Sequence, residues 1–225
     1  MEIEEIIRDI YPMSDEGISL LRPLLHEQRI WANTLMIRQG HLSREVFFVK
    51  SGVARNFTLC DGKEHTRWFA MDGDLLASMF SLSRGLPAVA SVEALTDMEV
   101  YTADIDKVKE LIVKSPEWAL WTSQYLIDGL YIIERRYTFL GQGDAYARYI
   151  NLQKMRSAKM LNFIPLQDIA SYLGITPQTL SRVRRRIAEA KIGSAEEEAK
   201  RIVNDAIKAA EQKRKETIIE AKDEA

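Results

Sequence analysis

The side chains with the clearest chemical potential lie in one short stretch, residues 165–187, which reads PLQDIASYLGITPQTLSRVRRRI. Pro165 suits the start of a helix, and Gly174 can end that helix in a left-handed turn. Thr176 can then cap a second helix whose first residue is a proline. The stretch therefore predicts a helix–turn–helix, a motif whose second helix enters the major groove of DNA.

The exposed positions of that second helix carry side chains suited to nucleic acid. Gln178 can form paired hydrogen bonds with adenine, and Arg182 can form them with guanine. Other polar side chains suit phosphates, which supply affinity but little sequence information. The phosphate candidates are Thr176, Thr179, Arg184, Arg185 and Arg186. The alternative is an ordinary helical hairpin with a basic exposed face.

The distribution of charge supports the same interpretation. The whole chain of 225 residues has a net charge of −2. Residues 1–144 carry 15 Lys/Arg against 22 Asp/Glu, residues 145–191 carry 9 against 2, and residues 192–225 carry 7 against 9. A compact basic segment between two acidic ones indicates a polyanion partner for the basic segment.

The elements that must position this motif begin with helices and continue with strands. Residues 1–26 predict two short helices divided by Pro12. Beyond residue 30 apolar residues recur at every second position, in short segments that are separated by turn dipeptides such as Asp61-Gly62. Short strands at this spacing predict an antiparallel barrel or jelly roll. The expected strands are 35–38, 45–50, 53–59, 64–70, 90–95 and 98–103.

Helical periodicity returns after Ala103. A short helix over 104–114 is followed by a long helix from Pro116 to about residue 140. One face of the long helix has apolar residues at alternating spacings of four and three, as in a coiled coil. We predict a subunit contact along this seam, with packing on the barrel as the alternative. The seam consists of Leu126, Leu130, Ile133, Tyr137 and Leu140.

Residues 10–187 resemble the Crp/Fnr superfamily of bacterial transcription regulators. The resemblance is carried by EVFFVKSGVARNF, GDLLASMF and ASVEALTDMEVYTAD, and most specifically by LGITPQTLSR. It implies an α+β fold with a cyclic-nucleotide-binding-like antiparallel β jelly-roll barrel, a long dimerisation helix and a winged helix–turn–helix. It also implies a homodimer on a two-fold-symmetric operator, with Gln178, Ser181 and Arg182 at base-reading positions.

The same resemblance implies an effector pocket, but its residues differ from those of cyclic-nucleotide binders. Ser78 stands where those proteins place a glutamate on the ribose, and Ala88 stands where they place an arginine on the phosphate. A buried phosphate would then lack its charge partner and donors, so we expect no cyclic AMP binding of the usual kind. Arg84 is an alternative phosphate ligand. The pocket candidates are Gly73, Ser78, Met79, Arg84 and Ala88.

Other chemistry is not indicated by the sequence. It has no phosphate-binding glycine loop, metal-ligand spacing or nucleophile elbow, so we predict no catalytic residue, metal or cofactor. A single cysteine, Cys60, excludes the cysteine cluster of an Fnr-type oxygen sensor. No apolar run reaches the ~18 residues of a membrane helix. With no signal-peptide pattern either, a cytoplasmic protein without a membrane partner is expected.

Residues 187–225 differ in composition, being mostly Ala, Glu, Lys and Ile. From IAEAKIGSAEEEAKRI onward they resemble the coiled-coil region of ribonuclease Y, without its catalytic domain or membrane anchor, so no nuclease activity is implied. The pattern predicts a long exposed helix in place of the family's wing. Ser194 and Glu197 form a capping box that predicts a new helix. A helix that ran straight on from the second helix of the motif could obstruct docking on DNA, unless Gly193 breaks it.

Four segments follow from these observations: a sensor barrel with N-terminal helices (1–115), a dimerisation helix (116–141), a helix–turn–helix domain (142–187) and a helical tail (188–225). The expected function is a homodimeric transcription regulator of double-stranded DNA. An unidentified small-molecule effector and RNA polymerase are further candidate partners. The alternative is an effector-sensing or scaffold module with impaired DNA binding and a helical interaction tail.

Overall fold

The computed structural model describes the backbone of residues 1–141, 143–155 and 161–223. It describes the side chains of this part except at 139–141, 155, 194–196, 199 and 207–223. The chain divides into two compact units, Met1–Leu180 and Ser181–Ala225.

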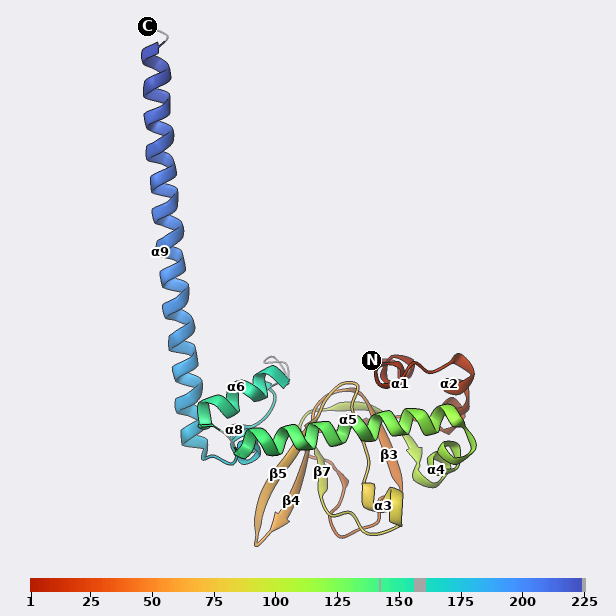
Figure 1. Ribbon diagram of the computed structural model, residues 1–225. Coiled ribbons are helices and arrows are strands. Elements are labelled where there is room, and N and C mark those ends of the chain that lie inside the picture. Colours follow the sequence, from red (N-terminus) through yellow and green to blue (C-terminus); the bar gives the residue numbers. More distant parts are fainter. Residues whose placement is uncertain (142, 156–160, 224–225) are drawn as a thin grey trace. The chain divides into compact units, whose positions relative to one another are not determined.

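Two four-stranded antiparallel sheets form the barrel (Figure 1). Their strand orders are β1-β8-β3-β6 and β2-β7-β4-β5. The strands are β1 (His26–Ile30), β2 (Leu35–Ile37), β3 (Glu45–Ser51), β4 (Ala54–Cys60), β5 (Lys63–Ala70), β6 (Leu75–Leu76), β7 (Ser91–Ala94) and β8 (Met98–Asp104). This arrangement agrees with the expected jelly-roll architecture.

The hairpin between β4 and β5 shows how the local sequence sets the register. Cys60 pairs with Lys63, so Asp61 and Gly62 form a two-residue turn. Both turn residues have positive φ, 50° and 73°, as the Asp-Gly dipeptide predicts.

Three short elements were not expected from the sequence. Strand β1 lies at the edge of its sheet and is exposed at four of its five residues, so it lacks an alternating apolar signal. The second predicted helix accordingly ends earlier, at Leu21, and a 3-10 turn over Arg22–Leu24 leads into the strand. The two-residue β6 and the six-residue helix α3 (Met79–Arg84) are shorter than any pattern can indicate.

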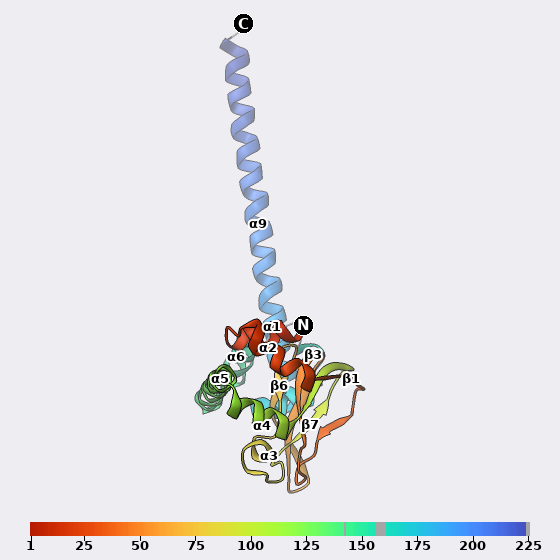
Figure 2. The ribbon, with the colours of Figure 1, turned by 90° about the vertical axis from the view of Figure 1, so that its right-hand side faces the viewer.

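The remaining helices surround the barrel or follow it in sequence. They are α1 (Ile3–Ile10), α2 (Asp15–Leu21), α4 (Ile105–Lys114), α5 (Pro116–Gly141), α6 (Ala145–Met155), α8 (Leu166–Leu173) and α9 (Pro177–Asp223). The long helix α5 runs beside the barrel and is seen nearly end-on in Figure 2.

Two apolar clusters stabilise the first unit. One lies between the sheets and includes Val49, Val92 and Val100. The other joins α1 and α2 to α4, α5 and the β1-β8-β3-β6 sheet, and its largest members are Trp118 and Trp121. The long helix is therefore attached to the N-terminal helices by its first two turns.

Helix α9 is continuous from Pro177 to Asp223, through Gly193. The prediction of a new helix starting at Ser194 is therefore wrong, and Gly193 does not break the helix. A helical glycine costs only about 1 kcal/mol relative to alanine, and strong helix formers flank this one on both sides. Within the described residues, no helix combines the length and apolarity needed to cross a membrane.

Candidate nucleic-acid interface

The turn between α8 and α9 has the geometry that its sequence predicts. Gly174 has φ 64° and ψ 37°, the left-handed region that glycine adopts without strain. Its N–H donates to carbonyls at the end of α8, and the N–H of Ile175 donates to the carbonyl of Ala170 at 3.0 Å. The glycine therefore both ends α8 and redirects the chain into the second helix.

Thr176 begins the second helix as expected. Its Oγ1 accepts a hydrogen bond from the backbone N–H of Thr179 at 3.1 Å, and the two threonine hydroxyls lie 2.9 Å apart. Pro177 takes the first helical position, where no intrahelical donor is needed. Leu180 is fully buried, as are Ile169 and Ala170 of α8. The first turn of α9 is thus fixed by a cap on one side and by apolar packing on the other.

Most of the predicted DNA-contacting side chains lie on exposed positions of α9. Gln178, Ser181 and Arg182 are exposed, and their spacing puts them on one helical face. Of the phosphate candidates, Thr176, Arg185 and Arg186 are exposed, whereas Thr179 and Arg184 are half-buried. Arg185 also forms an ion pair of 3.7 Å with Glu189, one turn along the helix.

A buried charged cluster attaches α8 to the barrel. The side chain of Arg55 on β4 is only 8% exposed and reaches the Asp168 carboxylate at 2.6 Å. The same guanidinium pairs with Glu64 at 2.7 Å and with Glu93 at 2.8 Å. One arginine therefore holds three carboxylates, two from the barrel and one from the helix–turn–helix.

The surroundings of this cluster raise the pKa of both Asp168 and Arg55. Burial raises the pKa of Asp168 above its usual value, and the carboxylates of Glu64 and Glu93 act in the same direction against the attraction of Arg55. Burial disfavours the charged form of Arg55, but hydrogen bonds and charges from Glu93, Asp168 and Glu64 outweigh it and raise the pKa of Arg55.

Contacts around β5 extend the attachment of α8. The Oγ of Ser171 accepts a hydrogen bond from the backbone N–H of Thr66 at 3.0 Å. Tyr172 packs against Phe69, with ring centroids 5.5 Å apart. Arg136 of α5 lies over the ring of Tyr172 at 4.6 Å, and it donates to the carbonyls of Thr66 and Arg67. The first helix of the motif is thus joined to both the barrel and α5.

Local sequence patterns do not predict this attachment. Arg55 and Asp168 are 113 residues apart, and Arg136 lies outside every motif that the sequence presents. A buried strand position occupied by arginine was the one available hint, since arginine is rarely buried without a partner.

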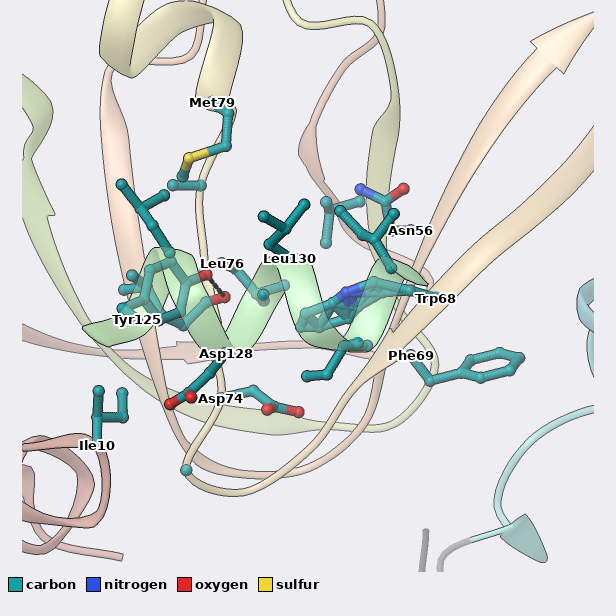
Figure 3. A pocket seen from close by; sticks show the side chains of 18 of the residues that line it. Ile10, Asn56, Trp68, Phe69, Asp74, Leu76, Met79, Tyr125, Asp128 and Leu130 are labelled. Carbon is teal, nitrogen blue, oxygen red and sulfur yellow. Dashed lines mark hydrogen bonds between the residues drawn. The ribbon is translucent and has the colours of Figure 1, made fainter. Parts of the chain in front are cut away.

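Two of the five effector-pocket candidates line the cavity that is described in the first unit (Figure 3). Gly73 and Met79 line a cavity of about 850 Å³ between the barrel and α5. Ser78 instead caps α3, accepting from the N–H of Ser81 at 3.2 Å. Ala88 is buried beside the backbone of Gly40 and His41, and Arg84 is exposed at the end of α3.

The predicted subunit seam lies on the exposed side of α5. Leu126, Leu130, Ile133 and Tyr137 are 51%, 59%, 54% and 80% exposed. Leu140 belongs to α5, but its side chain lies outside the described part. Leu126, Leu130 and Ile133 also line the cavity between the barrel and α5, so this face is open to solvent beside the barrel.

Comparison with known proteins shows which domain and which fold the chain resembles. Residues 27–115 match the cyclic nucleotide-binding domain family, and residues 168–225 match the ribonuclease Y N-terminal region. Among solved structures, the chain is similar to one described as a transcriptional regulator of the Crp/Fnr family from Eubacterium rectale. That similarity has 17% identity and a TM-score of 0.63, and covers 79% of this chain and 85% of the other. The chain therefore shares the fold of that structure, and its residues 27–115 match a cyclic nucleotide-binding domain.

Two further proteins are similar to the chain over most of its length. The probable transcriptional regulator flp of Lacticaseibacillus casei is 25% identical over 198 residues, covering 85% of this chain and 90% of that protein. FixK2 from Bradyrhizobium japonicum is 20% identical with a TM-score of 0.65, covering 75% of this chain and 86% of that one. The ribonuclease Y match confirms the resemblance expected for the tail, and it begins within α8 rather than near residue 187.

Proposed function

We propose that the chain is a homodimeric, sequence-specific transcription regulator that acts on double-stranded DNA in the cytoplasm. The observation that carries this proposal is the helix–turn–helix geometry: a left-handed glycine turn, a capped second helix, and exposed Gln178 and Arg182 on that helix. The net positive charge of residues 145–191 favours a nucleic-acid partner. RNA polymerase is a candidate partner of the DNA-bound regulator.

Base readout is assigned to Gln178, Ser181 and Arg182, with phosphate contacts from Thr176, Thr179, Arg184, Arg185 and Arg186. The test is selection of bound sequences from a random DNA pool by the full chain. We expect an inverted repeat with half-sites about one helical turn apart. No enrichment at low salt would contradict the proposal.

Arg182→Ala tests the readout directly. It should cost about 1–3 kcal/mol on the selected site and relax one base position. Arg201→Ala is the matched control, because Arg201 is an exposed arginine on the same helix. An equal loss on all DNA sequences would make Arg182 a phosphate contact instead.

Dimerisation through α5 is supported by the exposed apolar face of that helix, since contiguous exposed apolar patches commonly mark interaction sites. Ile133→Asp should convert the dimer to a monomer in light scattering. Val113→Asp is the control, because Val113 is 85% exposed on α4, away from this face. A dimer that survives Ile133→Asp would mean that the subunit contact lies elsewhere.

The barrel is proposed to bind no cyclic AMP in the usual way. The residues supporting this are Ser78, whose hydroxyl is engaged in capping α3, and Ala88, which offers no charge to a phosphate. Calorimetry with cyclic AMP and cyclic GMP should show no heat of binding. A micromolar dissociation constant for either nucleotide would overturn this part.

A second candidate function is favoured by the uninterrupted α9. This helix occupies the sequence where a wing would supply further phosphate contacts, and it exposes Ile192, Ile202 and Val203. In this alternative the tail is a helical interaction element and the chain is a sensor or scaffold. Repeating the DNA selection after removal of residues 188–225 separates the two: enrichment gained only on removal favours the scaffold.

A further inference from the structure

The free edge of strand β5 is covered by the first helix of the helix–turn–helix. β5 is the last strand in the order β2-β7-β4-β5, so one edge of its backbone faces away from the sheet. The N–H of Thr66 donates to the hydroxyl of Ser171 on α8 at 3.0 Å. The carbonyls of Thr66 and Arg67 accept hydrogen bonds from Arg136 on α5. Side chains of α8 and α5 therefore supply partners that a further strand would otherwise supply.

The arginine of the charged cluster is shared unequally between α8 and the barrel. Nη1 of Arg55 reaches Asp168 of α8, whereas its Nη2 reaches Glu64 on β5 and Glu93 on β7. If α8 moves away from the barrel, the guanidinium keeps both barrel carboxylates. Breaking a buried ion pair is costly mainly because one charge is left without a partner. Detachment of α8 does not leave Arg55 in that position.

The attached state also holds three carboxylates around one guanidinium. Glu64 and Glu93 repel Asp168, and together with burial they raise the pKa of Asp168. After detachment, the Asp168 carboxylate would be hydrated and free of this repulsion. One ion pair therefore holds the first turn of α8 on the barrel, and two like charges oppose it. A contact balanced in this way can be strengthened or weakened by the change of a single charge.

The attached position of α8 is unfavourable for docking on DNA. In helix–turn–helix complexes the first helix crosses the phosphate backbone, and helix N-termini are among the groups that contact phosphates. The first turn of α8 carries Asp168, which lies in one cluster with Glu64 and Glu93. A phosphate approaching this turn would meet the same barrel carboxylates and be repelled. The barrel and the DNA backbone therefore compete for the first turn of α8.

We propose that the attachment of α8 is an autoinhibitory latch: Arg55 holds the helix–turn–helix on the barrel through Asp168, and docking on DNA requires this contact to open. Glu64 and Glu93 limit the strength of the latch, because they repel Asp168 and keep Arg55 paired after opening. The latch rests on the proposed function for the identity of the polyanion, DNA. Two carboxylates of one cluster thus act in opposite directions, with Asp168 closing the latch and Glu93 opening it.

This opposition distinguishes the latch from general electrostatics. Removing any acidic side chain from a DNA-binding protein reduces repulsion of phosphates and ordinarily strengthens binding. Asp168→Ala and Glu93→Gln would then act alike. The latch predicts that Asp168→Ala strengthens DNA binding and that Glu93→Gln weakens it. The amide oxygen of the glutamine can still accept from Arg55, so only the repulsion of Asp168 is lost.

Exchange of one backbone amide measures the latch without DNA. The N–H of Thr66 donates across the attachment to Ser171, so it exchanges with solvent when α8 detaches. In the full chain, measured by NMR, Asp168→Ala should raise the exchange rate of this amide about tenfold, as loss of a hydrogen bond to a charged group implies. Glu93→Gln should lower the rate about threefold. If Glu93 only stabilised the fold, its replacement would raise the rate instead.

DNA affinity is the second readout. The duplex recovered by selection is titrated with each chain in a fluorescence anisotropy assay at one salt concentration. The apparent dissociation constant varies inversely with the fraction of chains whose latch is open. We therefore expect about tenfold tighter binding by Asp168→Ala and about threefold weaker binding by Glu93→Gln.

Glu99 provides the matched controls, because it is an exposed carboxylate on β8. Glu99→Ala and Glu99→Gln should leave exchange of the Thr66 amide within about twofold and should not weaken DNA binding. DNA binding by Glu93→Gln that is unchanged or stronger would overturn the latch. The same conclusion would follow if Asp168→Ala bound DNA no more tightly than Glu99→Ala.

The two readouts separate failure of the latch from failure of the proposed function. Opposite shifts of Thr66 exchange in a chain that binds no DNA would support the latch and contradict the regulator function. DNA binding that is equal in the unaltered chain, Asp168→Ala and Glu93→Gln would do the reverse.

Discussion

Helices of the first unit are attached at two places, and the principal contacts of the two attachments differ. At the N-terminal attachment, α5 is joined to α1 and α2 by buried indoles: Trp118 donates to the carbonyl of Gly17 and Trp121 to that of Ile7, each at 2.9 Å. At the α8 attachment, the principal contact is between charges, with Arg55 2.6 Å from Asp168.

This difference indicates which of the two attachments can be changed by solution conditions. Apolar burial is non-directional and independent of pH. The attraction within a buried ion pair has to offset a large desolvation cost, and this attraction depends on the protonation of both members. We therefore expect the N-terminal attachment to stay formed while the protein is folded. The α8 attachment, which carries the DNA-binding motif, is the one that can open.

The largest effect is expected at the N-terminal attachment. Trp118→Ala removes a side chain that is only 2% exposed and leaves a cavity among α1, α2 and α5. The free energy of unfolding, measured by urea titration, should fall by about 3–5 kcal/mol. Leu120→Ala, at a half-exposed position on the same helix, should change it by less than about 0.5 kcal/mol. Similar losses of unfolding free energy in the two variants would contradict the role of the buried indole in the N-terminal attachment.

Asp168→Ala should have the next largest effect. It leaves the buried guanidinium of Arg55 with only Glu64 and Glu93, and we expect a loss of about 1–3 kcal/mol. The loss should be local, so amide hydrogen exchange in α8 should rise more than exchange in α1. Asp97→Ala is the control, because its ion pair with Arg29 is about half exposed. Uniform exchange changes across the chain would mean that the α8 attachment does not open separately.

The two attachments also differ in how far the sequence predicts them. The apolar period of residues 3–10 and the tryptophans at 118 and 121 indicate buried faces, because helical periodicity is a local signal. The helix–turn–helix is equally local, since Gly174 and Thr176 determine the turn and the cap on their own. These parts of the fold and of the candidate site were therefore predictable.

The α8 attachment was not predictable, for a physical reason. Asp168 reads as an ordinary acidic residue in the first turn of a helix, and only the folded barrel brings Arg55 to it from 113 residues away. The cavity shares this property, because Asp74 and Asp128 come from a turn and a helix that the sequence treats separately. The capping box at Ser194 shows the opposite case: this local signal predicts a new helix, but the helix formers on both sides of Gly193 continue α9 through it.

Asp168→Asn tests the electrostatic part of the α8 attachment with a smaller change in shape. The pKa of Asp168 is raised in the folded state. At a pH between its ordinary and its raised pKa, the folded protein therefore retains a proton that the unfolded chain has lost. The contribution of Asp168 is therefore fully present below its ordinary value of 3.8 and is lost as pH rises through the raised value. Relative to the unaltered chain, Asp168→Asn should be less stable at pH 3.5 than at pH 7. Urea unfolding at both values measures this, and a difference that is independent of pH would contradict the raised pKa.

Glu117→Gln should give the smallest effect, with the opposite sign of pH dependence, at the N-terminal attachment. The Glu117 carboxylate accepts hydrogen bonds from the hydroxyl and the backbone N–H of Ser14, at 2.6 and 3.0 Å, and these lower its pKa. Its contribution is therefore present above the ordinary value of 4.5 and is lost as pH falls through the lowered value. Relative to the unaltered chain, Glu117→Gln should be destabilised at pH 7 and progressively less so below pH 4.5. Glu110→Gln is the control for the loss of an exposed carboxylate, because Glu110 lies in an exposed pair with Lys114. If Glu117→Gln and Asp168→Asn gave slopes of the same sign, the two attachments would not differ in the way that their contacts imply.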